Sequence, residues 1–260
     1  MLNLKEILNS YPANLQIFKR GILREYIQYK ILEIIYNSDY ANKLVFMGGT
    51  ALRIVNSNRR FSEDLDFDNK GLTQAEFTDL SVLIKNELEL EGLNVEIKTV
   101  FKNAFRIYIR LPKILYSEGL SELQDEKLTI QVDTTPQNFN YSAKIFLLDK
   151  FDIYTEINST PLDILLSEKF YAVFNRKRLK GRDFFDIDFL INNLGTKPNY
   201  EYLNFKCQIK NKKDLIIRLK EFLKDTNFKE LADDVRAFLF NGKQLGRVEN
   251  FYERIDILTL

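Results

Sequence analysis

The chain contains no histidine and a single cysteine, Cys207, among its 260 residues. Without histidine, Ser-His-Asp triads, histidine general acid–base catalysis and every His-containing zinc site are excluded. One cysteine can form neither an intramolecular disulfide nor a structural zinc site. Any catalysis must therefore use Asp, Glu, Lys, Tyr or metal-bound water. Metal-assisted phosphoryl chemistry meets that restriction, because it relies mainly on positioning and charge neutralisation.

Long apolar runs and an excess of either charge are also missing. No run approaches the roughly 20 apolar residues of a membrane span, and the first residues, MLNLKE, show no signal-peptide pattern. We therefore expect a cytoplasmic protein with no membrane partner. The net charge of +1 excludes a uniformly basic nucleic-acid surface but allows a local basic patch.

The most informative stretch, residues 44–68, reads LVFMGGTALRIVNSNRRFSEDLDFD. An apolar strand is followed by Gly48-Gly49, then Thr50 and a helix start, and finally a strand that carries Asp64 and Asp66. Glycines allow the backbone to approach a ligand closely, and the N–H groups at a helix start favour phosphate. The two aspartates share one face of their strand and repel each other, so they need a cation. Hard oxygen ligands suit Mg²⁺ or Mn²⁺.

A third aspartate follows a strand with the same alternation, at residues 128–133. Its apolar residues share one face, and Asp133 lies on the other face. We expect Asp133 beside Asp64 and Asp66 if the two strands are neighbours. The alternative is a single aspartate at the end of a strand.

The remaining pattern predicts helices over residues 14–36 and 73–91, the second with Thr73 and Glu76 as a capping box. Strands are predicted over 95–101 and 105–111, with a tight turn at Lys102-Asn103, and a last strand within 146–156. From residue 159 onward the period is helical, with Ser159 or Thr160 as the N-cap. These elements predict two domains, residues 1–156 and 157–260.

The string GGTAL, followed by R-x-S-x-D-L-D-F at residues 60–67, resembles the AbiEii-type toxin family of the DNA polymerase β-like nucleotidyltransferase superfamily. The resemblance implies an α/β (α+β) fold, with a mixed sheet and flanking helices, followed by a helical C-terminal domain. The active site would lie in the cleft between the domains. The resemblance also implies a third carboxylate on a nearby strand, and Asp133 fits it beside the metal ligands Asp64 and Asp66.

A second segment, residues 161–190, also resembles the family, in which a helical lysine is followed by R-D-x-x-D. Here these residues are Lys169, Arg182, Asp183 and Asp186. The resemblance implies that Lys169 and Asp183 belong to the active site, and leaves the relative roles of Asp183 and Asp186 open. A lysine ammonium can meet a triphosphate as a point charge. The alternative is a surface lysine and a capping aspartate.

These motifs lead to a hypothesis for the reaction. Asp64 and Asp66 bind metal that carries a nucleoside triphosphate, and its phosphates contact the phosphate-binding set, which consists of Gly48, Gly49, Thr50 and Ser62. Lys169, with Arg59 or Arg60, stabilises the departing pyrophosphate. Asp133 either binds the metal that activates the acceptor or takes the acceptor proton.

By resemblance, the acceptor is RNA, at the 3′ end of a tRNA, and the protein is the toxin of a toxin–antitoxin or phage-defence system with a cognate antitoxin. Two alternatives remain open, a nucleotidyltransferase for proteins or small molecules and a non-catalytic nucleotide-binding module. Five basic residues within positions 176–182 could either meet an RNA backbone or form a solvated helix end.

Overall fold

The computed structural model describes residues 1–102, 104–258 and 260. The predicted turn at Lys102-Asn103 therefore lies partly outside the described residues. The chain divides into two units by its contacts. Unit 1 comprises Met1–Ser57, Phe61–Asn138 and Ala143–Ser159, and unit 2 comprises Asn58–Arg60, Phe139–Ser142 and Thr160–Leu260. Two short segments that precede Thr160 thus belong to the second unit.

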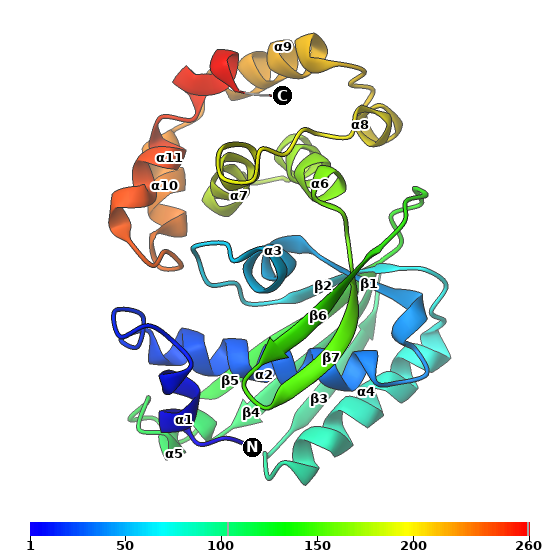
Figure 1. The fold of residues 1–260 in the computed structure, drawn as a ribbon, viewed down its shortest axis with the longest axis vertical. Helices are drawn as coiled ribbons and strands as arrows, with labels where there is room; N and C mark the ends of the chain where they lie inside the picture. The colour runs from blue at the N-terminus through cyan, green and yellow to red at the C-terminus, as the bar shows by residue number, and fades with distance from the viewer. Residues whose placement is uncertain (103, 259) are drawn as a thin grey trace. The chain divides into compact units, whose positions relative to one another are not determined.

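Unit 1 contains all of the described strands and five α-helices (Figure 1). The strands are β1 (Leu44–Met47), β2 (Leu65–Asn69), β3 (Glu96–Phe101), β4 (Phe105–Pro112), β5 (Lys127–Thr135), β6 (Lys144–Lys150) and β7 (Ile153–Ser159). The helices are α1 (Leu4–Asn9), α2 (Lys19–Tyr36), α3 (Gly48–Asn56), α4 (Gln74–Leu90) and α5 (Ile114–Ser117), with a 3₁₀ turn, η1 (Ala41–Lys43).

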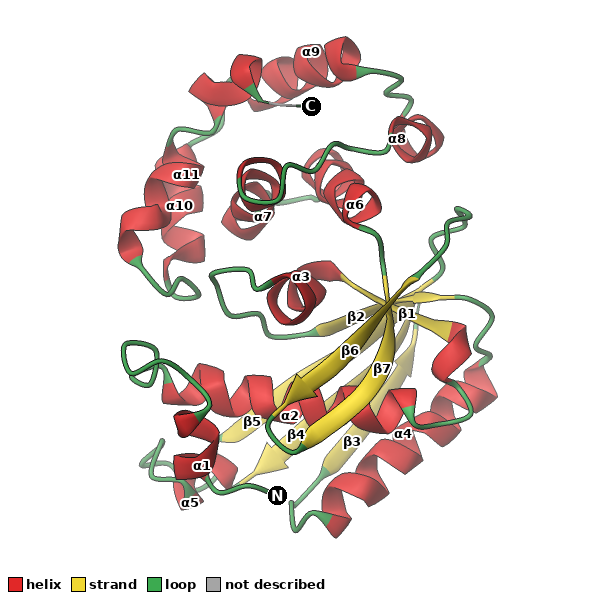
Figure 2. Ribbon diagram, viewed as in Figure 1, coloured by secondary structure: helices red, strands yellow, loops and turns green. Residues whose placement is uncertain are grey.

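The described strands form one seven-stranded sheet in the order β3-β4-β5-β2-β1-β7-β6 (Figure 2). The pairs β2–β5 and β1–β7 are parallel, and the other pairs are antiparallel. This mixed sheet with flanking helices confirms the predicted fold class. The single strand predicted within 146–156 is wrong, because β6 and β7 form a hairpin there. Phe151 makes its turn in the left-handed region, with φ of 62°.

One face of the sheet packs against α2 and α4, which contact β3, β4, β5 and β7. Ile107, Ile109, Ile130 and Val132 are buried on this face. The helix predicted over 73–91 is confirmed as α4, and Thr73 and Glu76 form the predicted capping box. The helix predicted over 14–36 begins later, at Lys19. The apolar alternation of the strands therefore places the core as predicted.

Unit 2 is helical, as predicted. It contains α6 (Leu162–Asn175), α7 (Gly181–Asn192), α8 (Tyr200–Cys207), α9 (Lys212–Leu223), α10 (Phe228–Arg236) and α11 (Gly246–Glu249), with 3₁₀ turns η2 (Gly242–Leu245) and η3 (Tyr252–Ile257). Helix α7 contacts α6, α10 and α11 and is buried over most of its length. The predicted caps Ser159 and Thr160 are wrong, because Pro161 is itself the N-cap of α6.

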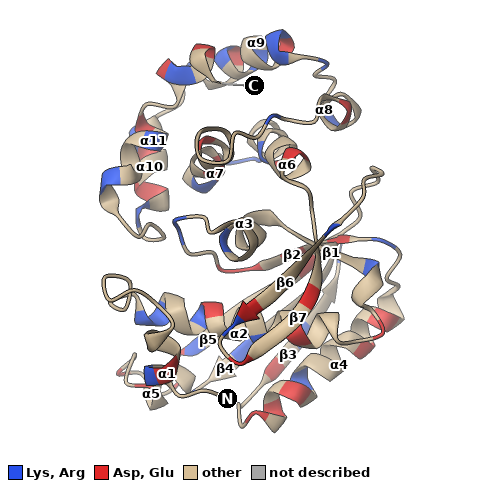
Figure 3. Cartoon of the chain, viewed as in Figure 1, with Lys and Arg blue, Asp and Glu red and all other residues tan. Residues whose placement is uncertain are grey.

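Two features of the whole chain bear on partners. Figure 3 shows Lys and Arg interspersed with Asp and Glu along helices of both units, in keeping with the net charge of +1. In the part of the chain that the structure describes, none of the helices combines the length and the apolar character needed to cross a membrane.

Candidate active site

Strand β2 places Asp66 in the middle of the sheet, and Asp64 immediately precedes the strand. Asp66 pairs with Met47 of β1 on one side and with Asp133 of β5 on the other. Leu65 and Phe67 are buried on the opposite face, as their parity predicts. The two strands are neighbours, which was the condition for the predicted position of Asp133, and Asp133 lies beside Asp66 on the same face.

The glycine turn fits closely around Asp66. Helix α3 begins at Gly48, whose φ is +78°, and a Cβ atom at this position would overlap the Asp66 carboxylate. The side chain of Thr50 is buried, and its hydroxyl donates a hydrogen bond to the Asp64 carbonyl oxygen. The start of α3, with its unsatisfied N–H groups, is thereby fixed against both aspartates.

A further residue supports this segment. Gln28 on α2 is buried, and its Nε2 donates to the carbonyl oxygens of Ser62, at 3.1 Å, and Glu63, at 2.9 Å. These bonds fix the backbone just before Asp64. Sequence reasoning missed Gln28 because a polar residue among apolar helical positions gives no indication of a partner more than 30 residues away.

The third carboxylate is already engaged by a cation. Arg106 of β4 lies directly across from Asp133 and donates to both of its oxygens, at 2.5 and 3.0 Å. Gln131 donates to the same carboxylate at 2.7 Å. Within the described residues, no group of three or more Cys, Asp or Glu side chains could hold a metal ion. The carboxylate oxygens of Asp64 and Asp66 are of the kind that a hard divalent cation prefers. The Asp133 carboxylate instead accepts hydrogen bonds from Arg106.

Unit 2 gathers the second predicted motif into a buried charge cluster. Lys169 of α6 is 9% exposed, and its Nζ lies 3.1 Å from Asp183 and 2.8 Å from Asp186. Asp186 also accepts from Arg60, with Nε and Nη2 both at 2.7 Å, and from Asn58 at 2.8 Å. The structure therefore brings together Lys169, Asp183 and Asp186 and adds two residues from the segment Asn58–Arg60.

The electrostatics of this charge cluster keep Asp186 and Lys169 ionised. Burial alone would raise the pKa of Asp186, but Arg60 and Lys169 outweigh it and lower that pKa to about 2. Burial opposes the charged form of Lys169, yet Asp186 and Asp183 raise its pKa above the ordinary lysine value. Lys169 is therefore a fixed cation and not a general base.

The two aspartates of α7 have different surroundings. Asp186 is fully buried between Lys169 and Arg60, and Arg60 is itself only 1% exposed. Asp183 is held by Lys169 and by Arg176 Nε at 2.8 Å, and the Arg176 side chain is 45% exposed. Arg59, by contrast with Arg60, is exposed. Asp183 is thus the aspartate with a neighbour at the surface.

The basic run 176–182 lies mainly in the connection between α6 and α7. Lys177 and Arg178 are exposed, and Arg178 makes only a distant 3.9 Å pair with Glu230. Arg182 instead lies over the Phe238 ring, with its guanidinium carbon 4.9 Å from the ring centroid. RNA contact by this run stays a prediction, and the exposed part is the portion suited to it.

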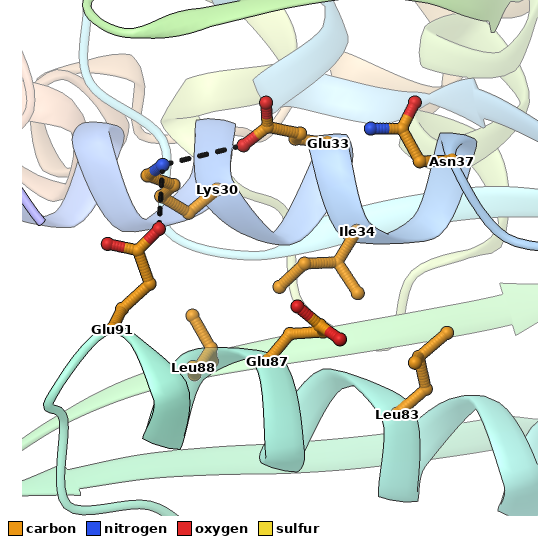
Figure 4. A pocket seen from close by; sticks show the side chains of 8 residues that line it. All are labelled: Lys30, Glu33, Ile34, Asn37, Leu83, Glu87, Leu88 and Glu91. Carbon is orange, nitrogen blue, oxygen red and sulfur yellow. Dashed lines mark hydrogen bonds and ion pairs between the residues drawn. The ribbon is translucent and has the colours of Figure 1, made fainter.

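A pocket of about 290 Å³ lies between α2 and α4, in unit 1 (Figure 4). Glu33, Glu87 and Glu91 line it, and Lys30 already lies 3.0 Å from Glu91 and 3.1 Å from Asp152. This acidic lining would repel a triphosphate. The pocket is therefore not the nucleotide site.

Comparisons with known proteins bear on the fold and on the family of this chain. JHP933 from Helicobacter pylori is 20% identical with a TM-score of 0.52, and the alignment covers 91% of this chain and 94% of that one. MenT4, a nucleotidyltransferase toxin from Mycobacterium tuberculosis H37Rv, is 14% identical with a TM-score of 0.58, covering 99% and 91%. At these identities the likeness shows the fold alone.

A comparison with curated protein sequences finds no match. A family model described as the nucleotidyl transferase AbiEii toxin of a type IV toxin–antitoxin system matches residues 30–253, so the chain belongs to the AbiEii nucleotidyltransferase toxin family.

Proposed function

We propose that this chain transfers a nucleoside monophosphate from a nucleoside triphosphate to a hydroxyl group of RNA, with a divalent cation. One observation carries the proposal: Asp66 lies against the glycine-started helix α3 and beside Asp133 in the sheet. The start of a helix favours phosphate, and here it lies next to Asp64 and Asp66, whose carboxylates suit a cation. This combination is suited to phosphoryl chemistry. Family membership supports the same reaction class.

Asp64 and Asp66 would hold the cation, Mg²⁺ or Mn²⁺. When bound, such an ion neutralises the triphosphate charge and orients the α-phosphate. The backbone N–H groups at Gly49 and Thr50 are the donors that we propose for the phosphates, because the Thr50 hydroxyl is already used by the Asp64 carbonyl. The Ser62 hydroxyl is the further proposed contact.

The acceptor oxygen attacks the α-phosphorus, and the bond from that phosphorus to the bridging oxygen breaks. Pyrophosphate leaves with the bridging oxygen, and the acceptor proton passes to solvent or to a carboxylate. We propose that Lys169, fixed in its charged state by Asp183 and Asp186, offsets the charge of the pyrophosphate. Of the two neighbouring arginines, the exposed Arg59 suits this task, whereas Arg60 is committed to Asp186.

Metal binding or proton acceptance by Asp133 would compete with the hydrogen bonds that Arg106 and Gln131 donate to its carboxylate. We therefore assign the metal to Asp64 and Asp66 and give Asp133 a supporting role. By family resemblance, the proposed acceptor is the 3′ end of a tRNA, the proposed effect is toxicity, and the proposed partner is a cognate antitoxin.

The test supplies each labelled nucleoside triphosphate, with Mg²⁺ and with Mn²⁺, to the full chain together with total RNA, cell protein or small metabolites. We expect label to enter RNA and pyrophosphate to be released in equal amount. Label that enters protein or small metabolites would show that this class of molecule, and not RNA, is the acceptor. Triphosphate binding by calorimetry without turnover would reject the enzyme in favour of a binding module.

A further inference from the structure

The second face of strands β3, β4 and β5 is open. On this face none of the side chains is buried, and its central members alternate with the buried isoleucines of β4. The members of this face are Glu96, Lys98, Val100, Arg106, Tyr108, Arg110, Lys127, Thr129, Gln131 and Asp133. Helices α2 and α4 pack on the opposite face, so the open face is polar and accessible.

This face continues directly from the metal-binding aspartates. Asp66 pairs with Asp133, and Asp133 pairs with Arg106, so the three residues form one row across neighbouring strands. At roughly 4.8 Å per strand, Arg106 lies about 10 Å from Asp66. Tyr108 and Arg110 follow on the same face of β4, and Lys98 lies beside Tyr108. The row therefore joins the proposed reaction centre to a basic strip.

The open face of β3, β4 and β5 has an excess of positive charge. Its two carboxylates are both taken by internal partners: Asp133 by Arg106, and Glu96 by Lys127 at 2.7 Å. Among the described residues, no carboxylate lies within ion-pair distance of Lys98 or Arg110. Two cations thus remain available to an anionic partner.

An aromatic ring lies between the cations. The guanidinium carbons of Arg106 and Arg110 lie 5.9 and 6.0 Å from the centroid of the Tyr108 ring. Arg106 Nη1 also lies 3.4 Å from the Tyr108 hydroxyl. The ring is half-buried. A base can stack against the ring and the planar guanidinium groups beside it, while the cations meet the flanking phosphates.

We propose that the sheet strip, which consists of Lys98, Arg106, Tyr108 and Arg110, binds the single-stranded end of a polynucleotide acceptor. Asp133 is then a positioning residue that holds Arg106 in the strip. The proposal builds on the proposed nucleotidyl transfer, because it gives the acceptor a path to Asp66. An acidic peptide would meet the cations but has no base to stack on Tyr108.

The experiment measures binding of a fluorescein-labelled single-stranded RNA to the full chain by anisotropy over a range of salt concentrations. Tyr108→Ala should weaken binding at least about fivefold through lost stacking. Arg110→Ala should lower the slope of log K against log salt by about 0.7. Lys144→Ala, which removes an exposed strand lysine from β6, is the matched control and should change neither quantity.

Triphosphate affinity, measured by calorimetry with Mg²⁺, should be the same in all three variants, which shows that the fold is intact. Failure of the wild-type chain to bind RNA would overturn the proposal that the sheet strip binds a polynucleotide. Equal RNA binding by Tyr108→Ala and Lys144→Ala would overturn it as well. Polyglutamate that competes as well as RNA, with no effect of Tyr108→Ala, would point to a peptide partner instead. RNA binding that depends on the strip, without nucleotide transfer, would leave the strip standing and reject the proposed reaction.

Discussion

Replacing Asp186 by asparagine should destabilise the protein more than almost any other isosteric change. The substitution keeps the shape of the side chain but removes the charge that faces Arg60 and Lys169, both of which are buried. Breaking a buried ion pair from one side costs about 3–5 kcal/mol, because the remaining charge stays buried without compensation. Here two cations would lose the carboxylate that they share, and Asp183 would still lie 3.1 Å from Lys169 Nζ.

The titration of Asp186 gives a separate, smaller figure. Its pKa falls from 3.8 to about 2 on folding, which corresponds to about 2 kcal/mol of stability. Because the folded pKa is lowered, this contribution is present above pH 3.8 and is lost as the pH falls towards 2. The wild-type chain should therefore lose stability over this interval more steeply than Asp186→Asn.

The assay is unfolding in urea at pH 7, followed by circular dichroism, and repeated down to pH 2. Asp188→Asn is the matched control, because Asp188 lies on the same helix and is equally buried. Its partners Arg247 and Arg254 have side chains 27% and 29% exposed and can be hydrated when it is removed. Equal losses in the two variants, or an unchanged Asp186→Asn, would refute the reasoning about buried charge.

Two glycine substitutions test close packing. Gly48→Ala should lower nucleotide transfer about a hundredfold, since the new Cβ would displace the Asp66 carboxylate; a steady-state assay that finds ordinary activity would contradict the predicted contact. Gly181→Ala should lower the free energy of unfolding by about 1–3 kcal/mol, because its Cβ would meet the Leu231 carbonyl oxygen. Gly242→Ala, where a Cβ would enter open space, should show almost no loss in the same unfolding experiment.

Local patterns in the sequence predicted much of the fold. The strand alternation correctly put Asp133 on the same face as Asp66, because side-chain parity and a buried face fix which way each side chain points. That the two strands are neighbours is known from the fold. The capping box at Thr73 was equally local and is confirmed. The hairpin of β6 and β7 was missed, because its turn contains Phe151 in a left-handed conformation where glycine or asparagine would have been expected.

The pairing of Arg60 with Asp186 at the candidate site could not be predicted in this way. Arg60 and Asp186 are 126 positions apart in the chain, and nothing in the local pattern of either residue indicates the other. Arg106 could have been noticed in the sequence, because it alternates with apolar residues on a predicted strand, as Asp133 does on its own strand. Its pairing nevertheless depends on β4 lying next to β5, which only the fold shows.

The central claim is that the carboxylates of Asp64 and Asp66 support metal-dependent nucleotide transfer. The most direct test measures transfer from labelled triphosphate with Mg²⁺ for the wild-type chain and for the double variant Asp64→Asn with Asp66→Asn. Asp149→Asn, an exposed aspartate of β6 in the same sheet, is the control, and thermal unfolding verifies that each variant is folded. We predict that the double variant falls to background while Asp149→Asn keeps full activity. Transfer retained by a folded double variant would contradict the claim.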